Sequence, residues 1–287
     1  MWQTNMIDLW NIAAIDQHAH NLLTPSAAAR YPYPAAFTEG YEPDIINHHA
    51  RHSLFYRRSM REIAQLLESE PEEEAILERR TQLGIDKITQ ICVKASKLEA
   101  IFLDDGFLPD EILPLEWHEQ FVPVQRILRL EYLAENLMSE VEDFRTFLER
   151  FRMPVQFHTG FGDPDLDLRL GNPLYMRSLL EDRRFRNAPI VLLHASYPYA
   201  QEAGYLASVY PQVYLDFGLA VPFLSVAGMR STLQQLLELA PTSKLMYSSD
   251  AHNIPELYYL GAKWGREVLG QVLDGASELP TRLSKRL

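Results

Sequence analysis

The chain has 287 residues, a formal net charge of −12 and 47% hydrophobic residues. The hydrophobic content argues against disorder, and the length is compatible with a single α/β barrel. The negative charge argues against nucleic acid as a partner and against an anionic membrane surface, because both are bound through clustered Lys and Arg. We therefore expect neither nucleic acid nor a membrane as a partner.

The single cysteine, Cys92, excludes an internal disulfide and lies in an apolar run that favours a buried side chain. The first residues do not show the basic segment and apolar core of a signal peptide. The chain also contains no uncharged apolar stretch of the about 18 residues that a membrane span needs. We expect a soluble, cytoplasmic protein without membrane contact, and we leave a homodimer open.

Short apolar runs alternate with longer helical patterns along the chain, which predicts βαβ units and a parallel sheet. Seven runs are predicted to be strands: Ala13–Asp16, Ile88–Val93, Val124–Leu130, Val155–Phe157, Ile190–Leu193, Val213–Leu215 and Leu245–Tyr247. Apolar residues at helical spacing predict helices at Ser59–Leu67, Pro71–Leu83, Tyr132–Phe151, Ser225–Leu239 and Glu256–Leu273. We interpret residues 21–86 as an insertion of loops and helices within a single domain of residues 1–287.

The first candidate site residues are His18 and His20, at the end of the first predicted strand. Side chains two residues apart in a strand point to the same face, so both imidazoles can reach one metal ion. The alternative is a pair of surface histidines, because a His-x-His motif alone is a weak signal.

The pattern is stronger when the other strand ends are included. His158, His194 and Asp250 each follow a predicted strand. In an α/β barrel the carboxyl ends of the strands form the active-site face, so these side chains are expected to converge there. Imidazole and carboxylate ligands suit one divalent ion, which favours zinc, with manganese or iron as alternatives. For each histidine alone, the competing interpretation is a buried, hydrogen-bonded core residue.

Other polar residues are weaker candidates for substrate binding. The acidic loop after His158 contains Asp165 and Arg169, and Arg169 is available to pair with a carboxylate. Lys94 and Glu131 follow predicted strands, where a surface charge or an ion pair inside the barrel is the alternative. A cluster of histidines at positions 48, 49 and 52 is compatible with a second metal site, or with simple solvent exposure.

Four segments carry a resemblance to a known family: Ile15–Asn21, Phe157–Leu170, Val191–Ala195 and Ser248–Asp250. They resemble the amidohydrolase superfamily and are most similar to the amidohydrolase-related domain of FluG/nodulin-type proteins, which is often fused to a glutamine-synthetase-like domain. The resemblance covers most of the chain, and the motif from His158 to Arg169 is its most specific part.

The resemblance implies a TIM-type (β/α) barrel with the fold of the metal-dependent hydrolases. His18, His20, His158 and Asp250 correspond to the family's metal ligands, and His194 to the histidine that polarises the substrate or transfers a proton. Asp250 then helps to deprotonate a metal-activated water that attacks a carbonyl. The implied reaction is hydrolysis of an amide or other C–N bond of a small-molecule substrate, with a γ-glutamyl-type amide suggested by the family's fusion partners.

The chain departs from the family pattern between Glu131 and His158. The predicted helix Tyr132–Phe151 nearly fills this interval, so one βα unit is predicted to be missing and about seven strands remain. A barrel normally closes with matched strand number, tilt and shear. Two alternatives to the hydrolase therefore stay open: a metal-dependent decarboxylase of the same superfamily, or a degenerate barrel that serves as a non-catalytic binding module.

Overall fold

The computed structural model describes residues 7–130 and 154–275. Its strands are β1 (Ala14–His20), β2 (Leu98–Asp104), β3 (Val124–Ile127), β4 (Val155–Phe157), β5 (Ile190–Leu192), β6 (Val213–Asp216) and β7 (Leu245–Met246). Its α-helices are α1 (Pro25–Ala28), α2 (Leu54–Leu67), α3 (Glu73–Ser96), α4 (Leu115–His118), α7 (Arg177–Leu180), α8 (Ala200–Val209), α9 (Ala220–Phe223), α10 (Val226–Leu237) and α11 (Glu256–Gly275). The predicted helix Tyr132–Phe151 lies outside the described residues.

Short 3₁₀ and π turns complete the described chain: η1 (Tyr33–Phe37), η2 (Ile45–His49), η3 (Ala50–His52), η4 (Pro173–Met176), η5 (Arg183–Phe185), η6 (His194–Ser196) and η7 (Thr242–Lys244). None of the described helices is both long and apolar enough to cross a bilayer.

All neighbouring strands pair in parallel, in the orders β1-β2-β3 and β4-β5-β6-β7. The two groups of strands meet where β1 lies beside the segment that follows β7. There the Gln17 amide donates to the Tyr247 carbonyl (3.2 Å), and the His20 amide donates to the Ala251 carbonyl (2.8 Å). The first and last strands are therefore joined by backbone hydrogen bonds, as in a barrel.

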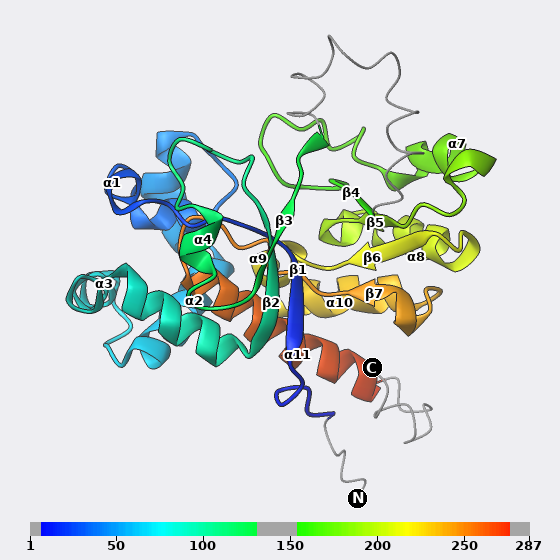
Figure 1. Cartoon of the computed structure of the whole chain (residues 1–287). Coiled ribbons are helices and arrows are strands. Elements are labelled where there is room, and N and C mark those ends of the chain that lie inside the picture. Colours follow the sequence, from blue (N-terminus) through cyan, green and yellow to red (C-terminus); the bar gives the residue numbers. More distant parts are fainter. Residues whose placement is uncertain (1–6, 131–153, 276–287) are drawn as a thin grey trace, which may run out of the picture.

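Helices cover the strands on two sides. Figure 1 shows α2, α3 and α4 on one side of the strands and α7 and α8 on the other, with α10 and α11 below β6 and β7. The helices α11 and α3 pack against each other, as do α10 and α8. This alternation of parallel strands and covering helices confirms the predicted α/β class.

The five strands β3 to β7 begin at the predicted residues and end within three residues of the predicted ends. Both bounds of β4 are as predicted. The first strand begins one residue late and extends to His20. Residues 21–86 contain helices and loops and no strand, as predicted. Cys92 is fully buried, also as predicted.

The predicted strand Ile88–Val93 is wrong, because this segment belongs to α3. Its buried residues follow the periodicity of a helix rather than that of a strand, and they form the face of α3 that packs on the core: Ile88, Thr89, Cys92, Val93 and Ser96. The chain then turns at Lys97, which has a left-handed backbone (φ 49°), and enters β2. Seven strands are thus present in the described residues, but the second lies ten residues later than predicted.

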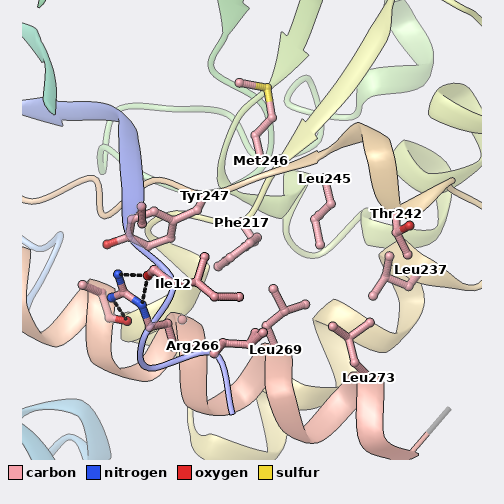
Figure 2. A pocket seen from close by; sticks show the side chains of 14 residues that line it. Ile12, Phe217, Leu237, Thr242, Leu245, Met246, Tyr247, Arg266, Leu269 and Leu273 are labelled. Carbon is pink, nitrogen blue, oxygen red and sulfur yellow. Dashed lines mark hydrogen bonds between the residues drawn. The ribbon is translucent and has the colours of Figure 1, made fainter. Parts of the chain in front are cut away.

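An apolar cavity of about 190 Å³ lies between β7 and the helices α10 and α11. Figure 2 shows Leu245 and Phe217 on its strand side and Leu269 and Leu273 on its helix side. The first residue of β1, Ala14, also lines it. None of the predicted site residues lines this cavity.

A buried ion pair joins the inserted segment to the last helix. Arg80 of α3 bonds to Glu256 at the start of α11, and the guanidinium also lies 5.1 Å from the centre of the Tyr33 ring. Glu256 is completely buried, whereas the Arg80 side chain is 16% exposed. A buried charge is stable only with its partner, so this pair constrains how α3 packs on α11.

Replacing Arg80 by Ala is expected to lower the free energy of unfolding by about 3–5 kcal/mol, because the Glu256 carboxylate then stays buried without its counter-charge. The double variant Arg80→Met, Glu256→Leu should recover most of this loss, since no buried charge remains. Chemical denaturation measures both values. Lys87→Ala, which removes an exposed cation from the same helix, is the matched control and should change little. A loss for Arg80→Ala no larger than for Lys87→Ala would contradict this expectation.

Candidate metal centre and active site

The strands bring three of the predicted residues together at their carboxyl ends. His18 and His20 lie at the end of β1, and Asp250 follows β7. The Asp250 amide donates to the His18 carbonyl (3.0 Å), so the contact between the first and last strands also places this carboxylate. Asp250 has a left-handed backbone (φ 52°), which turns the chain at the site.

Two imidazoles and one carboxylate form a compact donor set. The Nε2 atoms of His18 and His20 lie 3.3 Å and 3.4 Å from Oδ1 of Asp250. One ligand atom from each of the three residues lies within 4.8 Å of the others, and no other such group of three or more was found among the described residues. Both histidines are largely buried, with side chains 9% and 13% exposed.

The buried Asp250 carboxylate sets the charge of the site. Burial alone would raise its pKa, but the neighbouring imidazoles of His194, His18 and His20 hold the pKa well below its usual value. Burial likewise lowers the pKa of His18, but Asp250 outweighs it and raises that pKa to about 9. The carboxylate is therefore ionised and surrounded by imidazole donors.

His194 behaves differently from His18, although both face the same carboxylate. Its Nδ1 lies 4.0 Å from Asp250 Oδ2 and makes no hydrogen bond. Burial lowers the pKa of His194 to about 3, and the attraction of Asp250 offsets this only in part. His194 is therefore a neutral imidazole at physiological pH. A neutral imidazole has one ring nitrogen that donates a hydrogen bond and one that accepts.

Backbone geometry and a buried acid hold His194 in place. His194, Ala195 and Ser196 have positive φ values of 62°, 54° and 49°, a run that L-residues adopt only when it is stabilised by their surroundings. The Asp216 carboxylate accepts hydrogen bonds from the amides of His194 and Gly218, both at 3.1 Å. Asp216 is completely buried, so its hydrogen bond to the His194 amide is shielded from water.

His158 lies beside His194 rather than within the group of three. The two ring centres are 4.5 Å apart, whereas the Nε2 of His158 lies 3.0 Å from the Phe161 carbonyl. A carbonyl only accepts, so Nε2 carries the proton in this arrangement. The ring packs directly against Gly162, where a Cβ atom would lie 2.4 Å from it. The predicted role of His158 as a metal ligand stays a prediction.

The four predicted substrate-binding residues do not form one group. Asp165 and Arg169 are exposed in the loop after β4, and Arg169 pairs with Asp167 (2.7 Å). Lys94 is not at a strand end: it lies exposed in the last turn of α3, because the predicted strand before it is helical. Glu131 lies outside the described residues.

Two site residues were missed by the sequence reasoning. Asp104 ends β2, the strand that was predicted ten residues too early, and its Oδ2 bonds to Arg129 (2.7 Å and 3.0 Å) and lies 3.9 Å from His20 Nδ1. Gln156 lies two residues before His158 in β4 and bonds to the Nδ1 of His18 at 2.7 Å. The two-residue periodicity of strands could have placed Gln156 on the same face as His158.

Comparison with known proteins identifies the family and the fold of the chain. The amidohydrolase family model matches residues 132–282. Protein fluG of Emericella nidulans is 26% identical over 366 residues, and the match covers 90% of this chain and 42% of that relative. The chain thus spans less than half of the length of this curated relative.

Solved structures share the fold. A protein of Lactobacillus casei ATCC 334, to which a metal-dependent hydrolase function is attributed, has a TM-score of 0.79 at 24% identity, covering 98% of this chain and 94% of that one. A uronate isomerase of Bacillus halodurans C-125 has a TM-score of 0.55 at 13% identity, covering 96% and 87% of the two chains. At such identities the likeness establishes the fold alone. Together with the family match, which covers more than half of the sequence, it confirms the predicted barrel, and the chain belongs to the amidohydrolase family.

Proposed function

We propose that the chain is a metal-dependent hydrolase that cleaves an amide or other C–N bond of a small molecule. The observation that carries the proposal is the convergence of His18, His20 and Asp250 within 4.8 Å. Two imidazoles and a carboxylate suit zinc best, with manganese or iron as the alternatives, and they leave at least one position open, as catalytic sites do.

The positions of the donor atoms suit binding of a cation better than hydrogen bonding between the three side chains. Oδ1 of Asp250 is buried and accepts no hydrogen bond, although two imidazole nitrogens lie at 3.3 Å and 3.4 Å. Both separations exceed the usual N–H···O distance, and a buried carboxylate oxygen is normally satisfied. His18, His20 and Asp250 would hold the ion, and His158 is the candidate for a further ligand.

A divalent ion in this site would supply Lewis acidity, which lowers the pKa of water and polarises a carbonyl. Asp250 would accept the proton of the attacking water, because its carboxylate stays ionised while buried. His194 would hydrogen-bond the substrate carbonyl or pass a proton to the leaving amine, because its imidazole is neutral and its Nδ1 makes no hydrogen bond.

The substrate proposal is a small-molecule amide, with a γ-glutamyl amide as the first compound to test. This choice follows from the association of similar domains with glutamine-synthetase-like proteins and is an analogy rather than a feature of the site. Asp165 and Arg169, in the loop that follows β4, are the residues proposed to contact the substrate.

Metal analysis tests the site directly. We expect purified protein loaded with zinc to retain about one ion per chain, and His18→Ala, His20→Ala to lose it, because two of the three donors disappear. The matched control is His48→Ala, His49→Ala. These two histidines also lie near a carboxylate, that of Asp44 (3.9 Å and 3.4 Å), but all three side chains are exposed. An ion lost from both double variants, or from neither, would contradict the proposed site.

Turnover tests the chemistry separately. On an amide that the protein cleaves, His194→Ala should lower kcat by about 10²–10⁴, the usual contribution of a proton-transferring side chain. Its zinc content should stay unchanged, because His194 is not one of the three donors. Asp250→Asn should lower both quantities. Equal turnover of His194→Ala and the unaltered protein would overturn the role of His194. Release of carbon dioxide instead of amine would indicate a decarboxylase, and metal binding without turnover of any compound would favour a binding module.

A further inference from the structure

Gln156 spans the interior of the barrel between two strands that do not pair. It projects from β4, and its amide contacts β1 at three points. Its Nε2 lies 2.8 Å from the Gln17 carbonyl and 2.6 Å from the Gln17 side-chain oxygen, and its Oε1 lies 2.7 Å from His18 Nδ1. These contacts link residues that are 138 and 139 positions apart in the sequence.

The partners of Gln156 determine which way its amide faces. The Gln17 carbonyl can only accept a hydrogen bond, so the NH₂ group of Gln156 has to point toward it. The other end of the amide, the Oε1 oxygen, then has to face His18 and can only accept. Consequently the Nδ1 atom of His18 must carry a hydrogen.

This arrangement leaves the other ring nitrogen for the site. The Nε2 of His18 points to Asp250 Oδ1 at 3.3 Å, so Nδ1 is engaged on the side of the ring away from the carboxylate. Histidines that bind metals usually donate their second ring N–H to a partner of this kind, which fixes the ring orientation and the tautomer. We propose that Gln156 is the positioning residue that orients His18 so that its Nε2 faces the metal site.

The backbone explains why Gln156 is well placed for this task. Gln156 is the middle residue of β4, so its position is fixed by the pairing of β4 with β5. The two hydrogen bonds to Gln17 prevent rotation of the amide, and Gln17 is itself buried. Gln156, held on β4, therefore fixes the orientation of the His18 ring on β1, although it does not contact the proposed metal position itself.

This inference rests on the proposed metal site, and its test compares two Gln→Leu changes within the same hydrogen-bonded group. Gln156→Leu removes the acceptor for His18 Nδ1, whereas Gln17→Leu leaves the Gln17 carbonyl and hence the orientation of Gln156 intact. We expect the zinc dissociation constant, measured by competition with a chelator, to rise about 10–100-fold for Gln156→Leu. For Gln17→Leu it should change by less than about threefold. Equal effects of the two changes, or none for Gln156→Leu, would overturn the inference.

A spectroscopic readout tests the orientation of His18 without metal. In metal-free protein labelled with ¹⁵N in the histidine rings, His18 Nδ1–H should give a signal protected from exchange by its bond to Gln156. Gln156→Leu should abolish that protection, and Gln17→Leu should preserve it. Gln156→Met, which has a similar length but no amide oxygen, should also abolish it, and this variant serves if Gln156→Leu does not fold. Persistence of the protected signal in Gln156→Leu or Gln156→Met, or its loss in Gln17→Leu, contradicts the role of Gln156.

The two experiments separate failure of this inference from failure of the proposed function. Unaltered protein that binds no zinc, manganese or iron would overturn the metal site. The protected Nδ1–H signal would still decide whether Gln156 orients His18.

Discussion

The buried carboxylate of Asp250 is the constraint on which the rest of the site depends. An ionised carboxylate removed from water is costly unless oppositely charged or hydrogen-bonding groups surround it. Here the rings of His18 and His20, from β1, face Oδ1 of Asp250, and the ring of His194, which follows β5, lies 4.0 Å from Oδ2. The amide of the same residue bonds to the His18 carbonyl, beside the backbone bonds that join β1 to the segment after β7. The same backbone contact that joins the first strand to the segment after the last one therefore also brings the three donor side chains together.

The environments of two histidines around this carboxylate separate their roles. His18 contacts Asp250 at 3.3 Å and bonds to Gln156 through its other nitrogen, which raises its pKa to about 9 despite burial. His194 lies farther away at 4.0 Å, is enclosed, and has its pKa lowered to about 3. Divergent pKa values within one site are typical of a division between groups that hold charge and groups that move protons. The proposed assignment of His18 to the ion and His194 to the substrate follows this division.

Much of the fold and the central site residues could be predicted from the sequence, because strands buried on both faces are short, continuous apolar runs. The predicted run Ile190–Leu193 is such a case, because β5 (Ile190–Leu192) is apolar and buried throughout. The run Ile88–Val93 looks the same by composition, but its buried residues recur with helical periodicity. This ambiguity is inherent in short apolar runs. Because the strand was misplaced, Lys94 was predicted to lie at a strand end, and Asp104 was not recognised as the residue that ends β2.

What the sequence could not supply is the rotation of each side chain at the rim of the barrel. A strand end places a residue at the active-site face, but the ring of a histidine can still turn toward different partners. His158 shows this, because its Nε2 faces the Phe161 carbonyl although its ring lies edge to face beside that of His194. Gln156 shows the converse, since an uncharged amide has none of the ligand chemistry that marks a site, yet it fixes the ring of His18 across the barrel. Ligand type can be recognised in a sequence, whereas ligand orientation depends on neighbours that are distant in the chain.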